Sequence, residues 1–510
     1  MSKSECVVEV GTNTADTVNR EKDDPDIPSP RNPSNSEIIL HLDQYLSHLS
    51  QDQQHDVHNL LFQHQEVISD VPGQCSVMEH DITLINPRPS PVRQSAYRLS
   101  PSQKDAMRAE VDYLLQNRLA QPSKSPWASP CLLVPKPDGS KRFCTDFRKV
   151  NAVTVQDSYP LPLIEDLIDT VGNSKLVTTI DLQKGYYQIA LTPQAREISV
   201  FITPFGLYEY LVMPFGLVNA PATFRRIMNF VVQELPGVYA YLDDIVIVAN
   251  SWEEHLMRLR LLFQKLHEVG LTINLAKTKF CTGTVNYLGH VVGQGQAKPK
   301  KANVEAILNY PTPANRKDLM RFLGMAGFYR RFCVNFAEVS APLTDLTSVK
   351  RKFTWTAQCT RAFNCLKELL ASNPVLATPD HSRPFSLQID ASSRGVGSVL
   401  LQQNENTGVW HPISYFSYKL KDHQRSYSVV ELETLALVLS LERFKCYLSN
   451  NFPVTVYTDH NPLTFLRQMK NHNQRLVRWA LSLQEYPLLI KHIRGKDNLI
   501  ADALSRSPVE

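Results

Sequence analysis

The chain has 510 residues, of which 43% are hydrophobic and 20% are charged, a composition typical of a globular protein with several domains. Its formal net charge of +4 is too small to indicate a nucleic-acid partner by itself. Its nine scattered cysteines, without a CxxC pair, argue against a disulfide framework and against a cysteine zinc site. Because no apolar run could span a bilayer and the N-terminus lacks the apolar core of a secretory signal, we expect a soluble, intracellular protein with no membrane partner.

The first half of the chain predicts a disordered start, then helices, then mixed structure. Residues 1–36 are polar and proline-rich, which is typical of disorder. Apolar residues recur at helical spacing over 42–68, and a second helix is predicted over 102–119, after a strap rich in proline and arginine. The clearest strands are 175–191 and the two halves of a hairpin over 238–250, because both stretches are rich in β-branched and aromatic residues.

The second half predicts a helical region, a linker and a separate C-terminal unit. We expect residues 253–340 to be helical, with one helix ending at Gly270, a residue suited to a helix C-cap. Residues around 372–384 contain several prolines and read as a linker. Strands and helices are expected to alternate from 383 to 506.

Two adjacent carboxylates, Asp243 and Asp244, lie at the predicted turn of the hairpin VYAYLDDIVIVAN. Aspartate is a common turn residue, but two negative charges packed beside apolar strands require a proton, a cation or hydrogen-bond donors. A third carboxylate, Asp181, lies in the strand-forming run LVTTIDL, where it could instead pair with a lysine such as Lys184. If the three carboxylates converge, they could hold two Mg²⁺ ions and support nucleotidyl transfer to a 3′-hydroxyl.

Four motifs connect these carboxylates with a known family. YLDD, with DLQKGYYQI upstream, MPFGLVNAPATF between them and NYLGH downstream, resembles the reverse transcriptase of gypsy-type long-terminal-repeat retrotransposons. The resemblance runs from about residue 80 to residue 506. It implies that Asp181 and Asp243 bind two Mg²⁺ or Mn²⁺ ions and that Asp244 is a second, weaker ligand.

The resemblance also implies an α+β multidomain fold: a right-hand polymerase with fingers, palm and thumb, a connection, and a C-terminal ribonuclease H-like α/β domain. The expected division is a disordered segment 1–36, a helical N-terminal extension 37–85, fingers and palm 86–252, thumb and connection helices 253–340, connection and linker 341–382, the ribonuclease H-like domain 383–506 and a tail 507–510.

Several residues match positions that contact the incoming nucleotide in this family. By the resemblance, Lys136 and Arg142 hold the triphosphate, and Tyr186 excludes a ribose 2′-hydroxyl so that deoxynucleotides are selected. Tyr187 is expected to pack on the opposite face of the same strand, because side chains alternate along a strand. Phe215 stands where many retroviral enzymes carry glutamine, which favours stacking or packing over a hydrogen bond.

Primer contacts are expected further along the chain. Leu288 and Gly289 of NYLGH resemble the primer grip, a tight backbone turn that presses on the primer end. The stretches PKKANVEAILNY and FYRRF place cations beside aromatic residues. This pattern suits a duplex backbone, although a solvated helix face commonly carries the same charges.

A second set of acids occupies the C-terminal unit. Asp390 and Asp459 each end a predicted strand, Glu433 lies on an amphipathic helix, and Asp502 lies on a terminal helix. Each alone could be a cap or a surface group, but the order Asp, Glu, Asp, Asp resembles ribonuclease H, a two-metal enzyme that cuts the RNA of an RNA–DNA hybrid. Glu431 is the alternative to Glu433 as the second ligand.

The C-terminal unit departs from the relatives' pattern at two positions. Arg494 stands where many relatives have proline. His492 does not clearly occupy the place of the mobile histidine that many ribonucleases H use near the last aspartate. The resemblance therefore implies the carboxylate ligands but no proton-transfer assistant.

These implications together describe an enzyme that copies an RNA template from a DNA primer with deoxynucleoside triphosphates and degrades the RNA of the hybrid. The resemblance favours the cytoplasm or a virus-like particle, with the nucleus as an alternative. A decayed or domesticated protein that only binds nucleic acid is the competing interpretation. Because no protease or integrase segment is recognisable, we expect a piece of a larger polyprotein or a truncated copy.

Overall fold

The structure, a computed structural model, describes residues 33–87, 89–135, 141–160, 162–372, 374–392, 394–404, 407–448, 452–459 and 474–493. Most of the segment 1–36, for which disorder is predicted, lies outside the described residues. The prediction is wrong for its last two residues, because helix α1 (Asn35–Leu40) begins there. The buried side chain of Asn35 donates to the carbonyl of Ile273 and accepts from the backbone N–H of Leu275, both at 2.8 Å. Tertiary contacts therefore hold the start of this helix.

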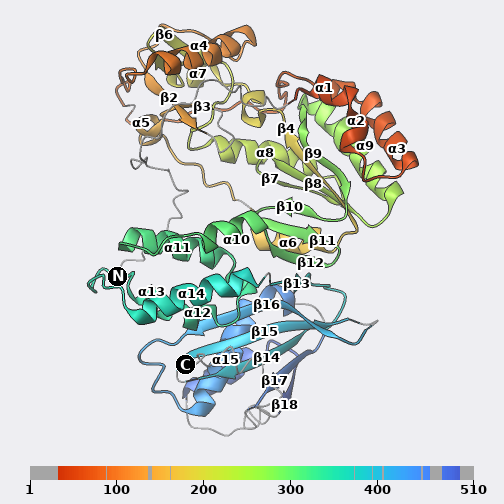
Figure 1. Ribbon diagram of the computed structural model, residues 1–510, viewed down its shortest axis with the longest axis vertical. Coiled ribbons are helices and arrows are strands. Elements are labelled where there is room, and N and C mark those ends of the chain that lie inside the picture. Colours follow the sequence, from red (N-terminus) through yellow and green to blue (C-terminus); the bar gives the residue numbers. More distant parts are fainter. Residues whose placement is uncertain are drawn as a thin grey trace.

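The N-terminal extension is a group of short helices that packs against strand β9 (Ile273–Thr282) and helix α9 (Trp252–Val269) of the palm (Figure 1). The helix predicted over 42–68 is divided into α2 (Leu42–Tyr45), α3 (Gln51–Gln63) and the 3-10 helix η1 (Gln65–Val67). The division falls at Ser50, because Ser50 and Gln53 each accept a hydrogen bond from the backbone N–H of the other. This reciprocal cap begins a new helix.

The predicted fingers contain a five-stranded sheet in the order β1-β6-β5-β2-β3. The strands are β1 (Ala120–Pro122), β2 (Ser129–Pro135), β3 (Lys141–Thr145), β5 (Phe201–Thr203) and β6 (Gly206–Tyr210), with helices α4 (Pro101–Gln116), α5 (Arg148–Asn151) and α7 (Pro193–Ile198) beside them. Helix α4 confirms the helix predicted over 102–119, apart from its last three residues.

The palm is a four-stranded antiparallel sheet in the order β7-β8-β4-β9. Its elements are β4 (Leu176–Leu182), β7 (Val238–Tyr241), β8 (Asp244–Ala249) and β9 (Ile273–Thr282), with helices α8 (Ala220–Val232) and α9 (Trp252–Val269). The hairpin and the C-cap at Gly270 are confirmed. The strand predicted over 175–191 is wrong beyond Leu182, because the chain turns at Lys184, whose φ is +48°, into the 3-10 helix η2 (Gly185–Gln188).

The predicted boundary at residue 252 is also wrong, because β9 pairs with β4 and so belongs to the palm sheet. Residues 253–340 are not all helical either. A second antiparallel sheet follows β9, made of β10 (Val285–Tyr287), β11 (His290–Gly293), β12 (Gln296–Pro299) and β13 (Leu376–Ala377), the last within the predicted linker. Buried and exposed residues alternate along β10 and β12, which is the two-residue period of a strand and not the period of a helix.

A layer of helices lies between the palm and the C-terminal domain (Figure 1). It contains α10 (Lys301–Leu308), α11 (Arg316–Phe328), the 3-10 helix η3 (Arg330–Phe332), α12 (Phe336–Val339), α13 (Ala341–Asp345) and α14 (Ala357–Ala371). Helix α6 (Ile164–Gly172) packs on strands β11 and β12 beside this layer. None of the described helices is long and apolar enough to cross a membrane.

Phe322 on α11 is buried in the core of this layer, and we expect its truncation to be costly. Its side chain is fully buried, and its ring centroid lies 4.5 Å from that of Phe363 on α14. Phe322→Ala should lower the free energy of unfolding by about 3–5 kcal/mol, because a buried aromatic ring leaves a cavity. Met320→Ala on the exposed face of the same helix should change it by less than about 0.5 kcal/mol. Chemical denaturation would measure both, and equal effects would contradict the packing.

The C-terminal domain is a mixed five-stranded sheet in the order β16-β15-β14-β17-β18. Its elements are β14 (Ser386–Ala391), β15 (Gly395–Gln403), β16 (Trp410–Lys419), α15 (Val429–Arg443), α16 (Lys445–Leu448), β17 (Val454–Thr458), α17 (Gln474–Leu483) and β18 (Leu488–His492). Three antiparallel strands come first, so the predicted alternation of strand and helix begins only at α15. Strands β14, β17 and β18 run parallel, which brings the ends of β14 and β17 to one edge.

Helix α6 on the palm side, the helical layer and the C-terminal domain meet at one buried carboxylate, Asp169 of α6. It accepts hydrogen bonds from Arg331 Nη2 of η3 at 2.9 Å and from the Tyr447 hydroxyl of α16 at 2.7 Å. Nearby, Arg443 Nη2 of α15 lies 3.0 and 3.1 Å from the two carboxylate oxygens of Glu165 on α6. Polar contacts therefore join the palm side, the helical layer and the C-terminal domain.

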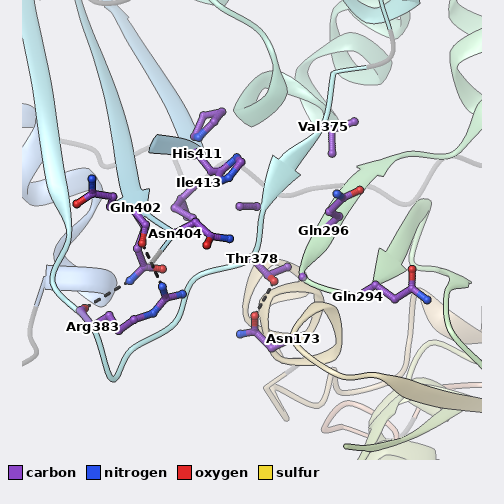
Figure 2. Close-up of a pocket in the computed structure, with 14 residues that line it drawn as sticks. Asn173, Gln294, Gln296, Val375, Thr378, Arg383, Gln402, Asn404, His411 and Ile413 are labelled. Atoms are coloured by element: carbon purple, nitrogen blue, oxygen red, sulfur yellow. Dashed lines mark hydrogen bonds between the residues drawn. The ribbon is translucent and has the colours of Figure 1, made fainter. Parts of the chain in front are cut away.

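A cavity of about 370 Å³ lies between the end of α6, the β11–β12 turn, strand β13 and the C-terminal domain (Figure 2). The Thr378 hydroxyl donates to Asn173 Oδ1 at 2.6 Å, and Gln402 Nε2 donates to the carbonyl of Asp380 at 2.8 Å. Much of the polar lining is therefore engaged in holding the interface together.

Candidate active sites

The palm carboxylates come from two neighbouring strands. Asp181 of β4 lies directly opposite Asp244, the first residue of β8, and Asp243 occupies the turn before it. Leu242 adopts a φ of +54°, so the turn between β7 and β8 is tight and both aspartates stay at one end of the hairpin. The structure therefore brings the three predicted palm residues to one edge of the sheet.

Burial and mutual repulsion raise the pKa of two of these carboxyl groups, Asp244 and Asp181. Burial and then the charges of Asp243 and Asp181 raise the pKa of Asp244 to about 6. Burial is also the main cause that raises the pKa of Asp181, and Asp243 adds to it, while Lys277 opposes the change. Such a cluster is costly without a cation, which fits a metal-binding role.

Lys277 of β9 is a partner that sequence reasoning missed. Its Nζ lies 3.2 Å from both carboxylate oxygens of Asp181. Lys184, the partner considered from the sequence, instead lies over the ring of Tyr113 at 3.6 Å. A metal ion held by Asp181 would have to share this carboxylate with the Lys277 ammonium group or displace it. Only the pairing of β9 with β4, across 96 residues, reveals the contact.

Tyr186 and Phe215 form an aromatic pair beside the carboxylates. Their ring centroids lie 4.8 Å apart in a stacked arrangement, and Phe215 is 42% exposed. Tyr187 meets the same Phe215 edge-on at 5.7 Å, so the expectation that strand alternation separates the two tyrosines is wrong; both belong to η2. Arg142 lies exposed on β3, and Lys136 lies outside the described residues.

The predicted primer-grip residues form the turn between β10 and β11. Leu288 and Gly289 have φ values of +46° and +78°. The carbonyl of Gly289 accepts a hydrogen bond from the Tyr329 hydroxyl at 2.7 Å, and a Cβ at this glycine would lie 3.2 Å from the ring of Phe328. Helix α11 and the residue after it therefore fix the shape of this turn.

The second carboxylate group lies at the edge of the C-terminal sheet. Asp390 is near the end of β14, Asp459 follows β17, and Glu433 projects from α15. One oxygen from each lies within 4.8 Å of the others. Burial, then the charges of Asp390 and Asp459, raise the pKa of Glu433 to about 9. Glu433 Oε2 is buried without a hydrogen-bond partner among the described residues, so a divalent cation would satisfy it.

Glu431, the alternative ligand, has a different role in the structure. Its side chain accepts from the backbone N–H of Ser428 at 2.9 Å and closes the cap of α15. Its other oxygen lies 2.8 Å from Arg475 Nη1. These bonds direct it away from the group formed by Asp390, Glu433 and Asp459.

The remaining predicted residues of this unit have different outcomes. Asp502 and Arg494 lie outside the described residues. His492 ends β18, and its Nε2 lies 3.1 Å from the backbone carbonyl oxygen of Asp459. Parallel pairing of Thr458 with His492 produces this proximity, which the sequence order alone does not reveal.

The protonated state of Glu433 predicts a pH-dependent stability in the absence of metal. Its pKa is about 9 in the folded chain and near 4.5 when unfolded, so unfolding releases a proton between these values and stability falls as pH rises through that window. Glu433→Gln should raise the free energy of unfolding in EDTA at pH 8 by about 1–3 kcal/mol and flatten the slope from pH 5 to pH 8. Glu442→Gln, on the exposed face of the same helix, should leave the slope unchanged. Thermal melting across pH would test this, and identical slopes would contradict it.

An antiparallel palm sheet with a carboxylate turn, followed by a mixed sheet with a second carboxylate group, defines a polymerase fold joined to a ribonuclease H-like fold. Residues 134–292 match the family described as reverse transcriptase (RNA-dependent DNA polymerase). Residues 380–486 match the RNase H-like domain found in reverse transcriptase.

The chain is similar to polyproteins of mobile elements. The retrovirus-related Pol polyprotein from transposon 297 of Drosophila melanogaster is 38% identical over 429 residues, which cover 82% of this chain and 40% of that protein. The transposon Tf2-3 polyprotein of Schizosaccharomyces pombe is 34% identical over 421 residues, which cover 82% and 31%. The chain therefore spans less than half the length of these relatives. It belongs to the reverse transcriptase and ribonuclease H region of retrotransposon Pol polyproteins, as its motifs predicted.

Solved structures share the fold. The foamy viral protease-reverse transcriptase dRH in complex with double-stranded DNA superposes with a TM-score of 0.77 at 23% identity, covering 88% of this chain and 80% of that one. The foamy viral protease-reverse transcriptase in complex with an RNA/DNA hybrid gives 0.70 at 22% identity, covering 91% and 62%. The predicted multidomain α+β fold is confirmed.

Proposed function

We propose that this chain is an RNA-directed DNA polymerase that also degrades the RNA strand of an RNA–DNA hybrid, each activity at its own two-metal site. The observation that carries this proposal is the presence of two separate carboxylate groups, one on the palm hairpin and one at the edge of the C-terminal sheet. A protein that only bound nucleic acid would gain nothing from such clusters of negative charge.

In the polymerase site, Asp181, Asp243 and Asp244 would hold the metal ions. When bound, Mg²⁺ or Mn²⁺ ions would activate the attacking oxygen and neutralise charge on the leaving group in both sites. The stacked rings of Tyr186 and Phe215 offer a flat surface beside the aspartates, which suits the sugar of a deoxynucleoside triphosphate. Arg142, and by resemblance Lys136, would bind the triphosphate, and Leu288 and Gly289 would hold the primer end.

In the nuclease site, Asp390, Glu433 and Asp459 would hold the metal ions, with Asp502 as a further ligand by resemblance. Deep burial favours protonated Glu433 without metal, so loading the site releases a proton from this side chain. The carbonyl of Asp459 keeps His492 beside the carboxylates, which makes this histidine a candidate for proton transfer.

The proposed partners are an RNA template, a DNA primer, their hybrid and deoxynucleoside triphosphates. Solved relatives in complex with double-stranded DNA and with an RNA/DNA hybrid support nucleic-acid partners of this kind. For the location we propose the cytoplasm or a virus-like particle, on the resemblance alone.

The direct test is incorporation of labelled deoxythymidine triphosphate on poly(rA) primed with oligo(dT), with Mg²⁺ or Mn²⁺. We expect incorporation that depends on primer and metal, and shortening of the RNA strand when a labelled hybrid replaces the template. A folded chain that binds the hybrid but does neither would favour the decayed-element interpretation.

A further inference from the structure

A basic cavity lies where the helical layer meets the C-terminal domain, apart from both carboxylate groups. Its volume is about 290 Å³, and it opens between η3, α12 and α13 on one side and β16 and the end of α15 on the other. Four cations line it, Arg330, Arg331, Lys419 and Arg443, and its lining contains no carboxylate. We name it the Arg331 pocket.

Arg331 is a buried cation with unused donors. Its side chain is 4% exposed, and Nη2 donates to Asp169 at 2.9 Å. Its Nε and Nη1 are buried without a hydrogen-bond partner among the described residues. Buried donors of a charged group are costly to leave unsatisfied, so this arrangement indicates a missing acceptor.

The charges around the pocket leave an excess of positive charge. Carboxylates outside the lining pair with two partly exposed cations of the pocket, Glu165 with Arg443 at 3.0 Å and Asp345 with Lys419 at 2.6 Å. Asp345 also pairs with Arg351 at 3.4 Å, so its single charge serves two cations. Arg330 is exposed at the rim and forms no ion pair with any described residue.

The hydroxyl groups of the lining do not supply the missing acceptors. Ser417 Oγ accepts from the backbone N–H of Ala337 at 2.8 Å, and the hydroxyls of Ser340 and Thr344 donate to backbone carbonyls at 3.3 and 3.0 Å. Among the described residues of the lining, the buried polar groups without a partner are therefore the Nε and Nη1 donors of Arg331. Such donors fit a ligand that offers acceptors and a negative charge. A guanidinium group can donate two parallel hydrogen bonds to two oxygens of one phosphate.

We propose that the Arg331 pocket binds a phosphate group, with Arg331 and Arg330 as its principal donors. The pocket lies close to the nuclease site along the sheet: Ser417 pairs with Gly397, which pairs with Asp390, so the two backbones are about 10 Å apart at ordinary strand spacing. The phosphate can come from a nucleic-acid strand or from a free phosphate compound, and both have the same recognition chemistry.

Titration calorimetry on the full chain tests the site. Inorganic phosphate is added to the protein in EDTA, and a control titration uses chloride at the same ionic strength. We expect saturable binding of one phosphate per chain, weakened about tenfold in Arg330→Gln, which removes one charged donor and leaves the ion pairs of Arg331, Lys419 and Arg443 in place. Arg361→Gln, an exposed arginine on α14, should bind as the wild type does. Arg331→Lys should also weaken binding, because it keeps the charge facing Asp169 but loses the planar donors.

Two further titrations identify the source of the phosphate. If Arg330→Gln weakens binding of a short RNA–DNA hybrid and inorganic phosphate competes with the hybrid, the pocket takes a backbone phosphate. If Arg330→Gln weakens binding of adenosine monophosphate and inorganic phosphate but not of the hybrid, the pocket binds a free phosphate compound. No saturable phosphate binding by the wild type, or equal affinity in Arg330→Gln, would overturn the proposal. Because no step requires catalysis, this outcome is independent of the polymerase and nuclease assays.

Discussion

Asp243→Asn is expected to abolish DNA synthesis on poly(rA) and oligo(dT) while cleavage of a labelled RNA–DNA hybrid continues. The substitution preserves the size of the side chain and the tight turn after Leu242, but removes one negative charge from the proposed metal site. Loss of a charge that stabilises the transition state commonly costs about 10²–10³-fold in rate, and loss of a metal ion costs more. Incorporation and cleavage should be measured on the same preparation.

The control for this prediction is Asp105→Asn, an exposed aspartate on α4 of the fingers. It loses the same charge and should retain full incorporation. Simultaneous loss of synthesis and cleavage in a folded Asp243→Asn chain would argue against two separate sites. Full incorporation in the variant would remove Asp243 from the polymerase site.

Glu433→Gln is expected to have the opposite effect: hybrid cleavage falls by at least about a hundredfold, whereas incorporation stays at the level of the wild type. The amide fits the buried position beside Asp390 and Asp459 but cannot become a negatively charged ligand. The same variant should be more stable than the wild type without metal, so the loss of activity could not be attributed to unfolding.

The matched control is again Glu442→Gln, on the same helix but exposed. It should cleave the hybrid normally. Higher Mg²⁺ concentrations should not rescue Glu433→Gln, since the charge is absent at any metal concentration. Undiminished cleavage in Glu433→Gln would show that another acid, such as Glu431, serves as the ligand.

Local sequence predicted those parts of the fold whose signals are local. The Asp243 hairpin, the helix ending at Gly270 and the strand that carries Asp390 all followed from short patterns of apolar residues and turn residues. The strand predicted over 175–191 failed because Lys184 adopts a left-handed conformation, for which a lysine gives no sequence signal. Once the chain turned there, Tyr186 and Tyr187 could no longer alternate across a sheet.

The parts of the sites that depend on long-range pairing could not be predicted in the same way. Lys277 reaches Asp181 only because β9 returns to pair with β4, and His492 reaches Asp459 only because β18 runs beside β17. The choice between Glu431 and Glu433 also required the structure, since both lie on the same helix and differ only in what surrounds them. The order of acidic residues along the chain indicated that Asp390, Glu433 and Asp459 lie together, but not their geometry.

The contacts of Asp169 have a consequence for any attempt to separate the two halves of this molecule. A polymerase ended at residue 382 would lose Tyr447, one of the two donors to Asp169, and would leave Glu165 without Arg443. It would also expose to water the surface that now packs against β16. The shortened protein should therefore be less stable and more prone to aggregate than the intact chain, even though Asp181, Asp243 and Asp244 are untouched. The C-terminal domain therefore contributes to the stability of the N-terminal part of the chain.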